Sequence, residues 1–117
     1  MNILHISNSN IKSSLLFWKQ IHSAIQTTVQ WSPAFNLEEI LDLDLSMYDL
    51  VIYEEKVGLT SLAVQMSENQ HLAEIINHIN HKLYVVTRRR STHSNTGVAV
   101  FTSRKDILSA LQAQNAR

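Results

Sequence analysis

Polar and charged side chains follow four apolar segments of the chain, at the points where strands of a parallel sheet would end. The carboxyl ends of parallel strands meet along one edge of a sheet, and ligands bind in the crevice there. Two carboxylates and two arginines within such a crevice could form ion pairs, and ion pairs of this kind also occur at functional sites. The residues expected there are Ser7, Asn8, Glu54, Glu55, Thr87, Arg88 and Arg104.

Arg88, Arg89 and Arg90 form the densest positive charge of the chain. They could bind phosphate, a nucleic acid or an acidic protein, or they could simply be a solvated loop. Lys plus Arg and Asp plus Glu number 10 each, so the formal net charge is zero and favours the solvated loop. The chain has no aromatic ladder or recognition helix of the kind that binds nucleic acid, so of the binding roles for this loop a protein partner is a better expectation than a nucleic acid.

Three histidines, His71, His78 and His81, lie on or near one expected helix. A zinc site would require a further histidine or carboxylate to converge on them. A polar helix end is the simpler interpretation, since histidine near a helix C-terminus also suits the helix dipole. We therefore expect no metal.

No serine considered as a nucleophile lies in a Gly-x-Ser-x-Gly turn; the serines considered are Ser7, Ser9 and Ser14. The chain also has no glycine-rich phosphate loop. Trp18 and Trp31 are interpreted as core or core-edge residues rather than groups that stack on a cofactor. The fold class would permit flavodoxin-type electron transfer, but no loop has the small residues that a flavin phosphate favours. We expect no cofactor and no enzymatic activity.

The elements that must position these residues alternate between strand and helix. Ile11, Leu15, Trp18, Ile21 and Ile25 recur at three and four residues, which is typical of an amphipathic helix. Short apolar or β-branched runs predict strands at 3–6, 27–31, 49–53, 83–87 and 98–101, and further helices are expected at 36–41, 59–80 and 105–114. This order predicts an α/β fold: a flavodoxin-like, doubly wound, five-stranded parallel sheet with helices on both faces.

The composition fits one globular domain over residues 1–117, with 44% hydrophobic and 17% charged residues. The absence of cysteine excludes a disulfide scaffold and a cysteine nucleophile. No apolar run approaches the roughly 20 residues that cross a bilayer, and the first residues do not resemble a signal peptide. We expect a cytoplasmic domain without membrane insertion, with a natural start at Met1 and a domain boundary near residue 117.

The first half of the chain resembles the receiver domain of two-component signalling, the CheY-like family. Residues 49–54 resemble the third-strand segment that ends in the phosphoacceptor aspartate, and Glu54 stands at the acceptor position. Residues 36–41, Asn-Leu-Glu-Glu-Ile-Leu, are similar to the Asn-Gly-Glu-Glu-Ala-Leu helix start of the family. The resemblance implies the CheY-like version of the flavodoxin-like fold.

The second half carries the same resemblance. Thr87 stands where receivers have the switch Ser or Thr, and Phe101 stands at the aromatic switch position. Arg104 replaces the lysine that binds the phosphoryl group. The resemblance implies that Thr87, Phe101 and Arg104 are remnants of the switch that operates in receivers.

Three departures imply that the phosphorylation chemistry is lost. Ser7 and Asn8 replace the acidic pair that holds magnesium, and neutral ligands supply too little charge for this ion. Glu54 is one methylene longer than aspartate, and arginine at position 104 keeps the charge of lysine but changes its geometry. Because phosphoryl transfer depends on the metal and on positioning, we expect a degenerate receiver that is neither phosphorylated nor Mg²⁺-dependent.

Only a short polar stretch separates Thr87 from Gly97, so the fourth helix of a receiver is expected to be reduced or replaced by a loop. Similar pseudo-receivers occur within hybrid sensor kinases. The resemblance implies a non-enzymatic module that binds a histidine kinase, another receiver or itself, with Glu54 either a constitutive mimic of phosphoaspartate or a solvated carboxylate without a role. The alternative is a small flavodoxin-like enzyme or nucleotide-binding protein that uses the same crevice.

Overall fold

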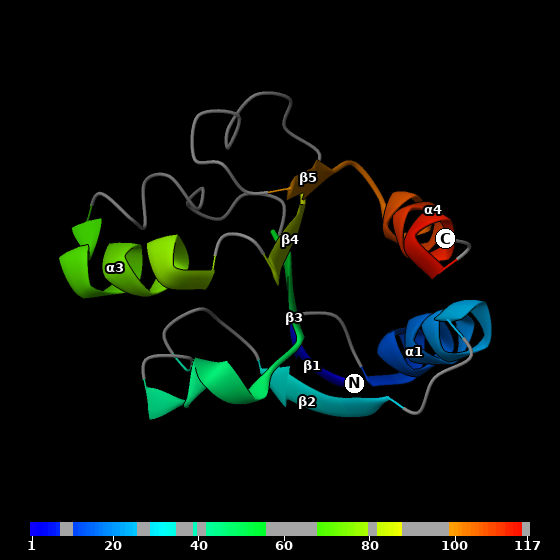
Figure 1. The fold of residues 1–117 in the computed structure, drawn as a ribbon, viewed down its shortest axis with the longest axis horizontal. Coiled ribbons are helices and arrows are strands. Elements are labelled where there is room, and N and C mark those ends of the chain that lie inside the picture. The colour runs from blue at the N-terminus through cyan, green and yellow to red at the C-terminus, as the bar shows by residue number, and fades with distance from the viewer. Residues whose placement is uncertain are drawn as a thin grey trace.

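The fold is known from a computed structural model, which describes residues 1–7, 11–25, 29–34, 39, 42–55, 68–79, 82–87 and 99–115. All five strands are parallel and lie in one sheet in the order β2-β1-β3-β4-β5 (Figure 1). The predicted α/β class with a five-stranded parallel sheet is therefore confirmed. The strands are β1 (Asn2–Ile6), β2 (Gln30–Ala34), β3 (Leu50–Glu54), β4 (Leu83–Val86) and β5 (Ala99–Phe101).

Three α-helices and a short 3-10 helix accompany the sheet in the described residues. Figure 1 shows α1 and α4 beside one side of the sheet and α3 beside the other. The short helix η2 precedes β3, and Asp44 caps its N-terminus by accepting the backbone N–H of Ser46. The helices are α1 (Ile11–Ile25), α3 (Gln70–Ile79), α4 (Arg104–Asn115) and η2 (Leu45–Met47).

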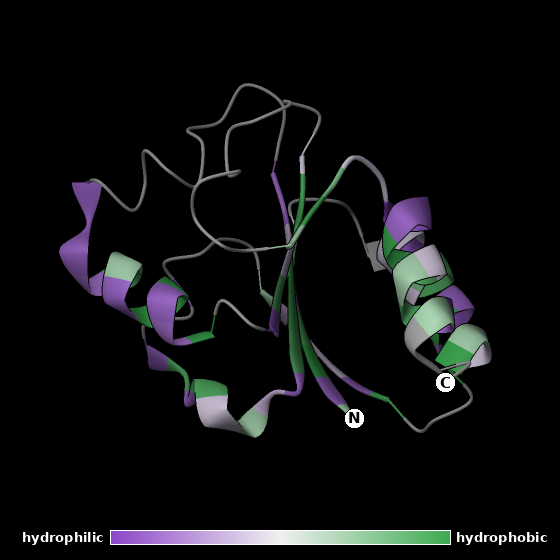
Figure 2. Ribbon diagram, turned by 45° about the horizontal axis from the view of Figure 1, so that its top comes forward, coloured by the Kyte–Doolittle hydropathy of each residue, from purple (hydrophilic) through white to green (hydrophobic). Residues whose placement is uncertain are grey.

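The core has two parts because successive strand side chains point to opposite sides of the sheet. One cluster contains Leu4, Ile6 and Val51 together with Leu72 and Ile76 of α3. The central strands are therefore apolar along most of their length, as Figure 2 shows in green.

The second cluster lies on the α1 and α4 side of the strands. Ile3 and Ile52 pack there with Phe17 and Ile21 of α1 and with Ile107 of α4. The candidate functional site described below lies on this side of the sheet, next to this cluster.

The face of α1 that meets the sheet differs from the prediction. Leu15, expected in the buried stripe, is 45% exposed, whereas Ser14 and Phe17 are buried. Residues 15–18 are four consecutive apolar side chains, and a helix cannot turn all four inward. The large ring of Phe17 takes the interior position, and Trp18 lies half-buried at its edge.

The second strand also differs from its predicted bounds. It was expected at 27–31 from its β-branched and aromatic residues, but it runs from Gln30 to Ala34 and pairs with β1 along its whole length. Pro33 is tolerated because β2 is an edge strand, where one side of the backbone forms no ladder. The other four predicted strands lie within one residue of their observed bounds.

Several predicted features lie outside the described residues. They are the helix at 36–41 apart from Glu39, the first part of the helix at 59–80, and the segment 88–98 that would replace a fourth helix. The expected break near 67–69 coincides with the start of α3. Asn69 accepts the backbone N–H of Leu72 there, as a residue that caps a helix does.

Candidate functional site

Glu54 is the last residue of β3, and its carboxylate lies between the start of α4 and the end of β1. The Arg104 guanidinium donates from Nε to Oε1 at 2.5 Å and from Nη2 to Oε2 at 2.9 Å. The Ser7 hydroxyl donates to Oε2 at 2.6 Å. Two parallel bonds from one guanidinium fix both the distance and the plane of the carboxylate.

The topology explains why these three residues meet. β1 and β3 are parallel neighbours, so Ser7 and Glu54 emerge at the same edge of the sheet. Arg104 follows β5 closely and is the first residue of α4. All three residues were predicted to lie at this edge, and in the structure they are in contact.

The site holds Glu54 in its ionised form. The side chain of Glu54 is 11% exposed and that of Arg104 27%. Burial alone would raise the pKa of Glu54, but His5, Arg104 and Ser7 together outweigh it and lower the pKa to about 2. The carboxylate is therefore neither solvated nor available as a base at neutral pH.

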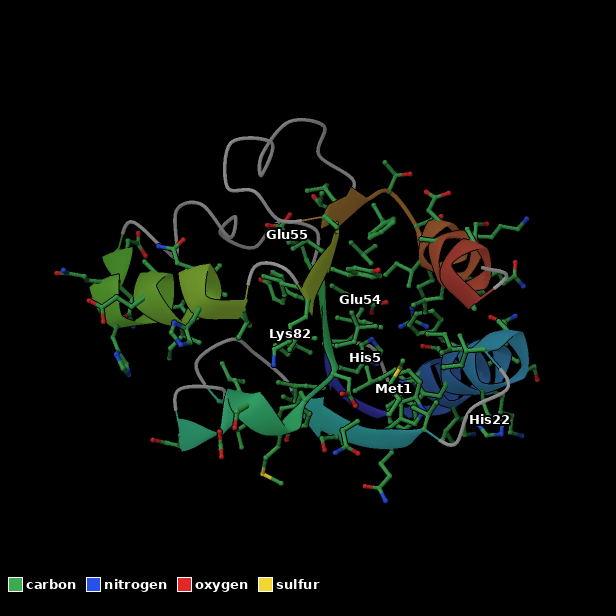
Figure 3. The ribbon with its side chains drawn as sticks, viewed as in Figure 1. Met1, His5, His22, Glu54, Glu55 and Lys82 are labelled. Atoms are coloured by element: carbon green, nitrogen blue, oxygen red, sulfur yellow. The ribbon has the colours of Figure 1, made fainter. Side chains whose placement is uncertain are left out.

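His5 lies beneath this carboxylate and is buried, at 2% exposure. Its Nδ1 accepts a hydrogen bond of 2.8 Å from the indole Nε1 of Trp18. An accepting Nδ1 carries no proton, so in the neutral ring the proton is on Nε2. Nε2 lies 3.5 Å from Oε2 of Glu54, which is long for a hydrogen bond but close enough for electrostatic attraction. Figure 3 shows both residues on the side of the sheet where α1 and α4 lie.

Aromatic rings enclose His5. Trp18 and Trp31 stack with ring centroids 4.9 Å apart at 12°, and Phe17 meets the imidazole edge-on at 5.5 Å. These rings exclude water from one side of the imidazole. The two tryptophans, predicted as core or core-edge residues, are half-buried.

Arg104 connects the site to α1 as well as to β3. Its Nη1 donates to the backbone carbonyl of Ser13 at 3.1 Å, and its guanidinium carbon lies 5.0 Å from the ring centroid of Phe17. The side chain of Arg104, at the start of α4, thus contacts both the first turn of α1 and the end of β3. The arginine therefore contributes packing and a cation–π contact as well as its charge.

Thr87 and Phe101 lie at the ends of the next two strands. Thr87 is buried, and its backbone N–H donates to the carbonyl of Phe101 at 2.9 Å. The ring of Phe101 is half-buried against Tyr84, with centroids 5.0 Å apart. Glu55 turns away from the carboxylate of Glu54 in Figure 3, and its backbone N–H donates to Val86.

Other predicted site residues lie outside the described residues, namely Asn8 and the arginines 88, 89 and 90, and so do Ser9 and His81, for which no role was predicted. In the described part of the chain, no group of three or more His, Cys, Asp or Glu side chains could hold a metal ion. His71 and His78 are both exposed on α3.

Sequence reasoning missed His5 and the contact between Arg104 and Ser13. The signal for His5 was present, because a lone ionisable residue interrupts the apolar run Ile3-Leu4-His5-Ile6. In a strand buried on both sides such a residue needs a buried partner. The partner, Trp18, follows only from the rotation of α1.

Comparison with family models, with curated proteins and with solved structures finds no match to this chain. Among the helices of the described residues, none has the length and apolar character required to span a membrane.

Proposed function

We propose that this chain is a non-enzymatic pseudo-receiver domain of a two-component or phosphorelay system, which acts by binding other proteins. One observation carries the proposal: the carboxylate at the acceptor position already has a permanent partner. Arg104 binds both oxygens of Glu54, and Ser7 donates to one of them. A position that accepts a phosphoryl group in a receiver is here a closed ion pair.

The chemistry of this pair opposes phosphoryl transfer. A phosphoacceptor must present a free carboxylate oxygen to the phosphorus, but the oxygens of Glu54 are held by hydrogen bonds and by a neighbouring cation. The side chain next to it, just after β1, is the hydroxyl of Ser7, which adds no negative charge for Mg²⁺. Attack would require the Arg104 bonds to break within a largely buried site, which is costly.

The same pair makes the domain resemble a receiver fixed in one state. Glu54 supplies a constant negative charge at the end of β3, and Arg104 binds it from α4 as a lysine would bind a phosphoryl group. Glu54 thereby acts as a constitutive mimic of phosphoaspartate. The strand order β2-β1-β3-β4-β5 supports the CheY-like, doubly wound arrangement, since it is the order of the flavodoxin-like class.

The low pKa of Glu54 also argues against the enzyme alternative. A general base works best with a pKa near the operating pH, and a carboxylate with a pKa of about 2 is a weak base at pH 7. The partners proposed for the domain are a histidine kinase, another receiver or a further copy of itself. Such a domain would act in the cytoplasm.

The test is incubation with a small phosphodonor and Mg²⁺, followed by intact-mass measurement, beside NMR titration with Mg²⁺ and beryllofluoride. We expect no phosphoryl adduct and no shift of the amides of Ser7, Glu54 and Arg104. The matched control is the triple variant Ser7→Asp, Glu54→Asp, Arg104→Lys, which returns acidic and lysine side chains to the site. A phosphoryl adduct on the unmodified chain would overturn the proposal.

A further inference from the structure

Helix α1 has an exposed face that joins apolar and basic residues. Lys12, Leu15, Leu16 and Lys19 are spaced i, i+3, i+4 and i+7, so they lie on one face of the helix. All four are exposed, Leu15 at 45% and Leu16 at 62%. We name these four residues the Lys-Leu face. Two adjacent exposed leucines between two lysines are suited to an apolar site with an acidic rim.

A groove with those properties lies between η2 and α3. It has a volume of about 500 Å³. Leu45, Ile75 and Ile79 supply apolar side chains, and Asp44 and Glu74 supply carboxylates. His71 and His78 also line the groove. We name it the acidic groove.

The charges of the described residues are divided between the two sides of the sheet, although the whole chain has a net charge of zero. On the side of α1 and α4, the free cations are Lys12, Lys19 and Lys105, and Asp106 is bonded to the Thr102 hydroxyl. The exposed acids of η2, its flanks and α3 are Asp42, Asp44, Asp49, Glu68 and Glu74, and among them Asp49 accepts the backbone N–H of Asn2.

The nearest described cation, Lys82, is a single charge among several carboxylates, and it attracts that of Asp44, so it offsets this acidic side only in part. The ammonium of Lys82 donates to the backbone carbonyls of Leu45 and Tyr48 at 2.8 and 2.7 Å. Its hydrogen bonds are thus directed at the backbone beneath η2. The rim carboxylates of the acidic groove therefore keep a field that attracts the lysines of the Lys-Leu face.

From this complementarity we infer that the chain associates head to tail with a second copy of itself, the Lys-Leu face of one molecule seated in the acidic groove of the next. Leu15 and Leu16 contact the apolar floor, and Lys12 and Lys19 lie near Asp44 and Glu74. The inference rests on the proposed function of an interaction domain and names its partner.

The placement of the two surfaces decides the form of the assembly. α1 and α3 lie on opposite sides of the sheet (Figure 1). A two-fold dimer cannot bring both pairs of surfaces together at once, so each molecule leaves one surface open for the next. Such heterologous contacts extend beyond two molecules, into a closed ring or an open chain.

Sedimentation velocity over a range of protein and salt concentrations tests this inference. We expect the weight-average mass to rise with protein concentration and to fall with salt, which screens exposed charges. The variant Leu15→Ser, Leu16→Ser and the separate variant Glu74→Lys should each weaken association by about tenfold or more, as central interface residues do. Val100→Ser, which changes an exposed apolar residue of β5, is the matched control and should associate as the unmodified chain does.

Mixing the two variants separates head-to-tail from two-fold association. The leucine variant keeps its acidic groove and the Glu74→Lys variant keeps its Lys-Leu face, so a 1:1 mixture should form dimers that do not grow further. Circular dichroism verifies that each variant is folded. Monomeric sedimentation of the unmodified chain at every concentration, or a mixture that stays monomeric, would overturn the inference. The phosphodonor assay is independent of both outcomes, so failure here leaves the pseudo-receiver proposal standing.

Discussion

Replacing Arg104 by methionine tests the physical basis of the site most directly. The variant keeps much of the apolar stem but leaves the Glu54 carboxylate with Ser7 and His5 as its neighbours. Loss of one partner of a fully buried pair costs about 3–5 kcal/mol. The shift of the Glu54 pKa from 4.5 to about 2 corresponds to a net of about 3 kcal/mol, which remains after burial has opposed the groups that lower the pKa. Arg104 is itself partly exposed, so we expect about 2 kcal/mol from its removal.

The pH dependence fixes the sign of this effect. Because the folded pKa of Glu54 lies below its ordinary value, the unfolded chain binds the proton more readily. The stabilisation is therefore complete above roughly pH 5 and is lost as the pH falls toward 2. In the Arg104→Met variant burial raises the pKa of Glu54 again, so acid should destabilise this variant less than it destabilises the unmodified chain.

Urea unfolding at pH 7 and pH 3.5, followed by tryptophan fluorescence, measures both quantities. The double variant Glu54→Gln, Arg104→Met is the control, because it removes both charges and should recover part of the lost free energy of unfolding. If Arg104→Met lost less than about 0.5 kcal/mol at pH 7, within the range of ordinary surface substitutions, the site would be a solvated carboxylate.

Three further substitutions test the surrounding structure by the same unfolding measurement. Phe17→Ala should cost about 3–5 kcal/mol because the ring is fully buried, whereas the exposed neighbour Leu16→Ala should change stability by less than about 0.5 kcal/mol. Lys82→Met should cost about 1–3 kcal/mol through two lost bonds to backbone carbonyls. Lys105→Met on exposed α4 should be neutral, and equal effects of the two substitutions would contradict a stabilising role for the Lys82 hydrogen bonds. Trp18→Phe should remove the hydrogen bond to the buried imidazole, at about 1 kcal/mol, and abolish the circular-dichroism couplet of the stacked indoles; a retained couplet would refute the stack.

Much of the fold could be predicted because the central strands are buried on both sides. Residues 50–53 and 83–86 are continuous apolar runs, and burial of both faces is what a parallel sheet flanked by helices requires. The contact of Ser7 with Glu54 followed from the same topology, since neighbouring parallel strands end together. That this chain is a receiver-like domain stays a prediction.

The remaining features depend on packing that a linear pattern does not contain. Which of the apolar residues 15–18 faces the sheet depends on how the Phe17 ring fits against Ile3 and Ile52. The bond from Trp18 to His5 depends on that rotation, and so does the contact of Arg104 with Ser13. The spacing of apolar residues predicted helix α1 correctly but its buried face only in part, because several rotations of the helix about its axis fit the same spacing.

The position of Arg104 in the chain has a consequence for folding during synthesis. Its carboxylate partner lies 50 residues earlier and its carbonyl partner on α1 lies 91 residues earlier. A ribosome delivers β1, α1 and β3 well before it delivers α4, so an early compact state would contain a buried carboxylate with no counter-charge. That state is unfavourable, and closure of the site waits until the last helix has emerged. The ion pair therefore couples α4 to α1 and β3, and the site cannot close before α4 is available.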